Sequence, residues 1–103
     1  MKNKIKNIYF VGIGGSGMSG IAEVMHNLKF NVQGSDLSKS ESITHLKKIG
    51  IKIFSNHLEK NIKNIDVLVV SAAISGQNPE VKAAIKQKIP IIPRAEMLSE
   101  LMR

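Results

Sequence analysis

Cysteine and tryptophan are absent from the 103-residue sequence, and aromatic side chains make up only 4% of it. Without cysteine, the chain has no disulfide, no thiolate metal site and no cysteine nucleophile. Stacking on single-stranded nucleic acid needs several aromatic side chains on one surface. Only Tyr9, Phe10, Phe30 and Phe54 are available, so the composition disfavours such a surface.

Long apolar runs and acidic side chains are also scarce. No segment approaches the roughly 20 consecutive apolar residues of a membrane-spanning helix, and the basic start of the chain is not followed by the apolar core of a signal peptide. We therefore expect a cytoplasmic protein that binds no membrane. The net charge is +7, but 13 of the 15 basic residues are lysines scattered along the chain. This scatter favours a solvated surface and no nucleic-acid partner.

The length fits one domain, within which two hydrophobic periods alternate. The periods predict strands over 5–11, 30–34, 51–54, 65–70 and 89–92, and helices over about 18–28, 38–48, 79–88 and 94–102. Strands that alternate with helices favour a parallel, doubly wound α/β sheet. We expect a Rossmann-like sheet of about five strands in a three-layer αβα arrangement.

Two predicted strands differ in how they should be covered. Residues 65–70 are almost continuously apolar, as in a strand that is buried on both faces. Pro90 interrupts the last strand and favours an edge position. In the helix that follows Asn78, an apolar stripe of Val81, Ala84 and Ile85 should face the core.

A glycine-rich turn carries the clearest chemical signal. Gly12, Gly14 and Gly17 form a G-x-G-x-x-G pattern between a predicted strand and a predicted helix, which is the context that the pattern requires. The first glycine permits a tight turn, the second lets the backbone approach a phosphate, and the third lets helix and strand pack. Free N–H groups at the start of a helix favour a pyrophosphate. A turn that serves packing alone is the alternative.

Residues 12–19 also come close to the ATP-binding pattern G-x-x-x-x-G-K-[ST], with Met18 in the place of the lysine. That lysine reaches the β- and γ-phosphates. The turn therefore suits binding of a diphosphate and not phosphoryl transfer.

Other polar residues follow the predicted strands. Asp36 lies 19 residues after Gly17, where a carboxylate can accept hydrogen bonds from a ribose. A turn aspartate is the alternative for Asp36, and a solvated loop residue is the alternative for His57. Because ligands bind beyond the carboxyl ends of the strands in open α/β sheets, we expect the loops at 12–17, 35–36, 56–57 and 71–74 to converge.

Nothing in the sequence supplies reaction chemistry to this site. No spacing of His, Asp and Glu suggests a metal ion, and no serine–histidine–acid arrangement can be identified. We predict no catalytic residue and no metal site. The residues alone indicate a nucleotide- or dinucleotide-binding unit, and a nicotinamide-dependent oxidoreductase domain stays open at this point.

Over essentially its whole length, the sequence resembles the N-terminal domain of the Mur ligases of peptidoglycan synthesis. The segments that carry the resemblance are GIGGSGMSGIAE at 12–23, GSD at 34–36, His57 with Asn61, VSAAI at 70–74, NPE at 78–80 and RAEMLSELMR at 94–103. Generic dinucleotide-binding dehydrogenases lack the last segment. The sequence GSGMS at residues 15–19 resembles the ligase that adds L-alanine more than the related ligase that recycles murein tripeptide.

The resemblance implies a three-domain enzyme. The first domain binds the UDP part of UDP-N-acetylmuramate, the second binds ATP with Mg²⁺, and the third receives L-alanine for amide formation on the muramoyl carboxylate. Residues 1–103 contain no P-loop pattern and would be the first domain alone. We therefore expect no cofactor in this chain and no ligation by it, with UDP-N-acetylmuramate and the two other domains as its partners.

The resemblance also implies a set of substrate-binding residues. The pyrophosphate would be held by Gly14, Gly15, Ser16, Gly17, Met18 and Ser19. Ser35 and Asp36 would lie near the ribose and uracil. The nucleotide pocket would be completed by His57, Ser71, Ala72, Ala73 and Ile74. Asn56 and Ala72 depart from the family pattern, which often has glycine and serine there, and no role is assigned to Arg94 or Glu96.

Overall fold

Strands and helices alternate along the chain, as the hydrophobic periods predict. In the computed structural model, which describes residues 5–101, the strands are β1 (Asn7–Val11), β2 (Asn31–Ser35), β3 (Lys52–Phe54), β4 (Val67–Val70) and β5 (Ile91–Pro93). The helices are α1 (Met18–Asn27), α2 (Glu41–Lys48), α3 (Pro79–Lys86) and α4 (Arg94–Leu101), with a 3-10 turn, η1, at Glu59–Asn61. Met102, predicted to end the last helix, lies outside the described residues.

All five strands run parallel, in the order β3-β2-β1-β4-β5. The chain first builds outward from β1 to β3, and then adds β4 and β5 on the other side of β1. The direction of building therefore reverses between β1 and β4, which is the position where open α/β sheets bind ligands. The predicted doubly wound α/β fold is confirmed.

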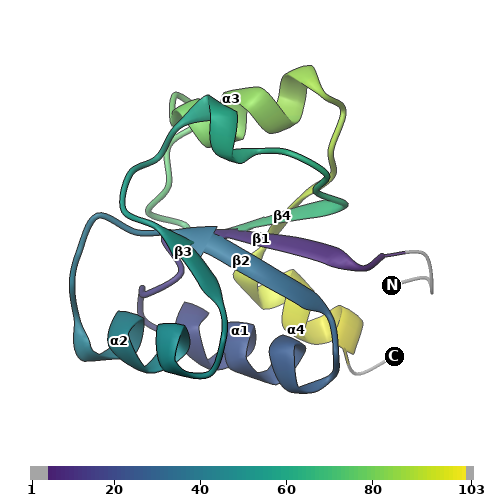
Figure 1. Cartoon of the computed structure of the whole chain (residues 1–103). Helices are drawn as coiled ribbons and strands as arrows, with labels where there is room; N and C mark the ends of the chain where they lie inside the picture. Colours follow the sequence, from purple (N-terminus) through teal and green to yellow (C-terminus); the bar gives the residue numbers. More distant parts are fainter. Residues whose placement is uncertain (1–4, 102–103) are drawn as a thin grey trace.

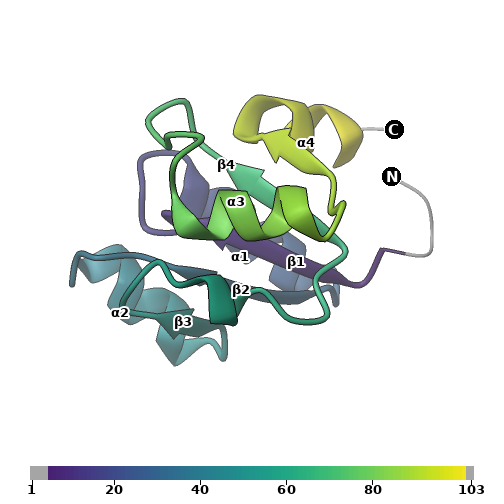
Figure 2. The same cartoon turned by 90° about the horizontal axis from the view of Figure 1, so that it is seen from above.

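Helices cover both faces of the sheet and give three layers (Figure 1). One face carries α1, α2 and α4, while the other carries α3 and η1; Figure 2 looks onto this second face, with α3 in front of the sheet. Alternation along β1 supplies both cores. Ile8 and Phe10 pack on the α1 side, whereas Tyr9 and Val11 pack on the α3 side. No helix within residues 5–101 is long and apolar enough to cross a membrane.

The two strands with distinctive cover behave as predicted. Val67 and Val69 of β4 are buried on the α1 side and Leu68 is buried on the α3 side, so both faces of this strand are covered. β5, which follows Pro90, lies at the edge of the sheet.

The predicted apolar stripe of α3 is wrong at Ile85, whose surface is 61% exposed. The buried residues of this helix are Glu80, Val81, Ala83 and Ala84. Residues three and four positions apart share a helix face, so Glu80 faces the sheet together with the two alanines. The buried face of α3 thus includes an acidic residue that the apolar pattern left out, and it excludes Ile85.

The second helix also begins later than predicted, at Glu41. The hydroxyl of Ser40 accepts a hydrogen bond from the N–H of Ile43 at 3.4 Å, which caps the helix there. Ser38, the predicted start, instead donates its N–H to the carboxylate of Asp36 at 2.8 Å. A local side-chain contact therefore holds Ser38 in the loop.

Gly34 lies where a side chain does not fit. A Cβ there would be 2.5 Å from the carbonyl oxygen of Phe10 and 2.9 Å from Cβ of Ile13. We expect Gly34→Ala to lower the free energy of unfolding by about 1–3 kcal/mol, because overpacking displaces neighbours in a close-packed core.

The matched control is Gly20→Ala, since a Cβ at this position in α1 would meet nothing within 4 Å. This variant should raise the free energy of unfolding by about 0.5–1 kcal/mol, because glycine costs that much in a helix. Urea unfolding at unchanged m-value measures both changes. Equal midpoints for the two variants would contradict the packing around Gly34.

Candidate functional site

The loops that follow β1 to β4 meet at one edge of the sheet. The carbonyl oxygen of Ser35 accepts a hydrogen bond from the N–H of Gly12 at 2.8 Å, and the N–H of Asp36 donates to the carbonyl oxygen of Phe54 at 3.0 Å. A Cβ on Gly12 would lie 3.4 Å from Cδ1 of Ile74, so the loop after β4 packs against the glycine turn. The structure thus brings the predicted loops together where the strand order reverses.

The glycine turn leaves backbone donors open at the start of α1. Gly12 and Gly17 have φ angles of +76° and +78°, which glycine adopts without strain. Gly17 is the N-cap of α1 and no side chain caps it. Among residues 5–101, no acceptor is found for the N–H groups of Ser16 and Gly17. Free N–H groups at the positive end of a helix attract anions, so the turn is suited to a phosphate.

Gly14 allows close packing against α2, and its predicted role in phosphate binding stays a prediction. A Cβ there would lie 2.7 Å from Cδ1 of Ile43 in α2, and the N–H of Gly14 donates to Oδ2 of Asp36 at 2.9 Å. Met18 has a fully buried side chain, and its N–H donates to the carbonyl oxygen of Gly15. Within the turn itself the open donors therefore belong to Ser16 and Gly17, and the N–H groups of Ser19 and Gly20 in the first turn of α1 also have no acceptor among residues 5–101.

The carboxylate of Asp36 ties the glycine turn to the loop after β2. Oδ2 accepts from Gly14, and Oδ1 accepts from both the N–H and the hydroxyl of Ser38 at 2.8 Å. Partial burial raises the pKa of Asp36, but the hydrogen bonds from Ser38 and Gly14 and the nearby His57 outweigh it, and the net pKa is lowered. The structure thus shows the turn role for Asp36. A carboxylate accepts about four hydrogen bonds, which leaves one for a ribose hydroxyl.

Arg94, to which the sequence assigned no role, lies over the glycine turn. A Cβ on Gly17 would be 2.8 Å from one guanidinium nitrogen of Arg94 and 3.2 Å from its Cζ. No ion pair between described residues involves this side chain. Arg94 follows β5 directly. Its place at the carboxyl end of a predicted strand, which it shares with the other loops, is the one sequence signal that could have pointed to it.

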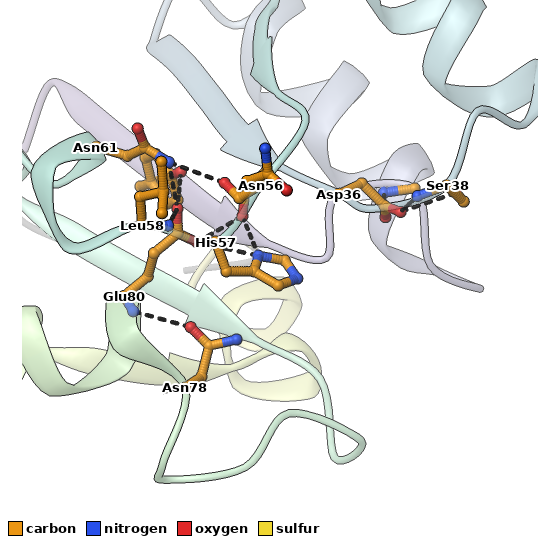
Figure 3. A network of polar contacts seen from close by, with 11 residues as sticks. Asp36, Ser38, Asn56, His57, Leu58, Asn61, Asn78 and Glu80 are labelled. Carbon is orange, nitrogen blue, oxygen red and sulfur yellow. Dashed lines mark hydrogen bonds and ion pairs between the residues drawn. The ribbon is translucent and has the colours of Figure 1, made fainter.

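A buried carboxylate lies beside these loops on the α3 side (Figure 3). Glu80, in the first turn of α3, is fully buried. Its Oε2 accepts hydrogen bonds from the hydroxyl of Tyr9 at 2.5 Å, from Nδ2 of Asn61 at 2.8 Å and from the N–H of Leu58 at 3.3 Å. Burial, and then the bond to Glu80, raise the pKa of Tyr9 far above its usual range, so the phenol stays a neutral donor.

The second oxygen of Glu80 reaches two predicted site residues. Oε1 accepts from the hydroxyl of Ser35 at 2.5 Å and lies 3.3 Å from Nδ1 of His57. The Ser35 hydroxyl is in turn 2.7 Å from the same Nδ1. Ser35 is fully buried. Its hydroxyl contacts His57, and its carbonyl oxygen accepts from the glycine turn. His57 itself keeps a side chain that is 16% exposed.

The sequence contained a weak signal for Glu80. The acidic residue stands three and four positions before Ala83 and Ala84, where an apolar face would continue. One glutamate in the first turn of a helix is commonly a surface residue that complements the helix dipole. A buried glutamate is distinguished from such a surface residue only by the donors that reach it, which here come from β1, β2 and η1.

The loop after β4 lies beside the glycine turn. The N–H of Ile74 donates to the carbonyl oxygen of Ser71 at 3.1 Å, which closes a turn. Ala72 and Ala73 are exposed, and Ile74 packs against the core on the α3 side. This loop offers mainly backbone groups and small side chains to a ligand.

Pockets occur both at this site and away from it. A pocket of about 210 Å³ opens beside Asp36, between α2 and β3, with Ile43, Lys47 and Ile53 in its lining. A larger hollow of about 510 Å³ lies toward the amino ends of β1 and β2, where Asn7 and Asn31 line it. We place the candidate site at the strand ends because the open donors and the reversal of strand order coincide there.

The described residues do not fit ATP or a metal ion. Within residues 5–101, no group of three His, Asp or Glu side chains could hold a metal. Met18, in the place of the P-loop lysine, points its side chain into the core on the α1 side. The glycine turn therefore lacks the amine that would reach a γ-phosphate.

Known proteins are similar to this chain in sequence. Residues 7–103 match the family described as "Mur ligase family, catalytic domain". The chain is 54% identical over 103 residues to a UDP-N-acetylmuramate--L-alanine ligase of Neisseria meningitidis. The match covers the whole of this chain and 22% of that relative.

Solved structures share the fold. A UDP-N-acetylmuramate-alanine ligase from Thermotoga maritima is 33% identical with a TM-score of 0.89, over 93% of this chain and 22% of that one. A UDP-N-acetylmuramate:L-alanyl-gamma-D-glutamyl-meso-diaminopimelate ligase from Neisseria meningitides is 27% identical with a TM-score of 0.85, over 93% and 31%. The chain thus spans less than a third of the length of these proteins and belongs to the Mur ligase family.

Proposed function

We propose that this chain is a domain that binds the uridine diphosphate part of UDP-N-acetylmuramate, within a ligase that joins L-alanine to that substrate. The observation that carries the proposal is the uncapped start of α1, where the N–H groups of Ser16 and Gly17 are open at the reversal of strand order. Membership of the Mur ligase family and the named relatives support the substrate class.

In this proposal the diphosphate lies over the glycine turn. Ser16 and Gly17 donate their N–H groups to it, and the guanidinium of Arg94 supplies a positive charge beside Gly17. The nucleoside extends over the loops after β2 and β3, toward Asp36 and His57. The Ser71–Ile74 turn closes the opposite side. This chain then contributes binding and orientation and no catalytic residue.

The rest of the proposed reaction belongs to other parts of the enzyme. ATP and Mg²⁺, which the ligation consumes or requires, would bind in further domains, because the residues described here do not fit them. We propose a cytoplasmic enzyme, and we expect no L-alanine-dependent phosphate release from the 103-residue chain alone.

Calorimetric titration of the chain tests the ligand class. We expect UDP-N-acetylmuramate and UDP to bind and NADH to give no heat above dilution, because the chain belongs to the Mur ligase family and its named relatives are ligases of UDP-N-acetylmuramate. Binding of NADH without any response to the uridine nucleotides would indicate an oxidoreductase domain and overturn the proposal.

Replacement of Arg94 tests the phosphate position. Arg94→Ala should weaken UDP binding by about tenfold, because a hydrogen bond to a charged group contributes about 1.5 kcal/mol or more. Binding of uridine, which lacks the phosphates, should not change. Lys82→Ala removes an exposed charge from α3 and is the control for net charge. An equal loss in both variants would show that only the overall charge matters.

The Asp36 tie gives a pH dependence with a defined sign. Its pKa is lowered in the folded chain, so its stabilising contribution is complete above the ordinary aspartate pKa of about 3.9. The contribution is lost as the pH falls through the lowered value. In NMR titrations, the amide protons of Gly14 and Ser38 should shift together below pH about 3.9, and Asp36→Asn should abolish this shared transition. A transition above that pH would contradict the tie.

A further inference from the structure

We propose that Glu80 is a positioning residue for the nucleotide. Acting through Ser35, it holds the neutral ring of His57 as the Nδ1–H tautomer and presents the lone pair of Nε2 to a hydrogen-bond donor of the nucleoside. The identity of the ligand rests on the function proposed above, whereas the tautomer is a property of the chain alone.

The donors around Glu80 define the direction of each hydrogen bond. The N–H of Leu58 and Nδ2 of Asn61 can only donate, so Oε2 must act as an acceptor. Removing a carboxylate from water costs several kcal/mol. Four donors, the hydroxyls of Tyr9 and Ser35, Nδ2 of Asn61 and the N–H of Leu58, offset this cost together with the N-terminus of α3. An ionised carboxylate can therefore remain buried, and it cannot donate to Ser35.

Ser35 carries this constraint to the imidazole. Its single hydroxyl proton points to Oε1 of Glu80 at 2.5 Å. The serine oxygen is then an acceptor toward Nδ1 of His57, 2.7 Å away, and Nδ1 must carry the proton. Oε1 of Glu80, 3.3 Å from the same nitrogen, favours the same tautomer. In a neutral imidazole, the hydrogen bond made by one ring nitrogen decides which of the two nitrogens carries the proton.

The second ring nitrogen is open. Within residues 5–101, no partner is found for Nε2 of His57, and no buried side-chain nitrogen or oxygen atom is left unsatisfied. Nε2 therefore reaches solvent. Figure 3 shows it on the side of the ring that points away from Glu80. Asp36 is the other charged group near this side, and Gly14 and Ser38 already engage its carboxylate.

This arrangement assigns a chemical class to the contact. A neutral Nε2 with a lone pair accepts a hydrogen bond from an O–H or N–H group. Uridine offers two such groups, the ribose hydroxyls and the imide N–H of uracil. His57 would thus recognise the nucleoside as an acceptor, on the other side of the site from the diphosphate donors of the glycine turn.

The variant Glu80→Gln tests the inference because it reverses the direction of the hydrogen bonds that run from His57 through Ser35 to residue 80. The amide oxygen of Gln must face Asn61 and Leu58, which can only donate, so its NH₂ group faces Ser35. Ser35 then accepts from that amide and donates its own proton to Nδ1. We expect ¹⁵N NMR of the neutral ring to show Nδ1–H in the parent chain and Nε2–H in the variant.

Two further variants separate this effect from lost stability. Tyr9→Phe removes a donor to Oε2 and leaves the side of Glu80 that faces Ser35 intact, so Nδ1–H should persist. Ser35→Ala leaves Oε1 of Glu80 facing Nδ1, so Nδ1–H should persist there too. If Glu80→Gln does not fold, the parent spectrum still decides: an Nε2–H tautomer in the parent chain overturns the inference.

Binding of UDP completes the test. Glu80→Gln should weaken UDP binding by about tenfold, because an Nε2–H would oppose the donor of the nucleoside, and Tyr9→Phe should not. Two analogues identify the donor: 2′-deoxy-UDP lacks the 2′-hydroxyl, and N3-methyl-UDP lacks the imide N–H. The analogue that lacks the group bound by Nε2 should bind the parent chain and Glu80→Gln with equal affinity. Unchanged UDP affinity despite a reversed tautomer overturns the role of Glu80. If UDP fails to bind the parent chain, the function proposed above fails, while the tautomer result stands independently.

Discussion

The buried carboxylate of Glu80 is the constraint on which the proposed nucleotide-binding edge of the sheet depends. A carboxylate with no exposed surface needs donors on every side, and these come from β1, β2 and the segment around η1. Meeting that need fixes the end of β2 against α3 and holds the loop after β3 in place. One electrostatic requirement therefore sets the positions of Ser35 and His57 together.

The opposite half of the site is organised by main-chain geometry. The carbonyl oxygen of Ser35 accepts from Gly12, and the carboxylate of Asp36 accepts from Gly14, so β2 also shapes the glycine turn. With those donors engaged, open N–H groups remain at Ser16 and Gly17 and in the first turn of α1, and the guanidinium of Arg94 lies beside Gly17. Ser35 thus links the two halves: its carbonyl supports the glycine turn, where we propose the diphosphate, and its hydroxyl supports His57, where we propose the nucleoside.

Much of the fold could be predicted because it follows from periodicity. The parallel α/β order, the doubly covered β4 and the edge position of β5 depend on patterns along one segment at a time. The start of α2 was missed because capping by Ser40 and the tie between Ser38 and Asp36 are local details that hydropathy does not record. The buried face of α3 was missed because Glu80 bonds to Ser35, 45 residues away. Arg94 was overlooked for a similar reason, since its contact with Gly17 exists only in the folded chain.

The central claim is that the start of α1 binds the diphosphate of a uridine nucleotide. Backbone NMR of the ¹⁵N-labelled chain during titration with UDP tests it most directly. The account predicts that the amide signals of Ser16 and Gly17 move most and saturate together, as a direct hydrogen bond to phosphate requires. Saturable binding of UDP that leaves these two amides unmoved would contradict it.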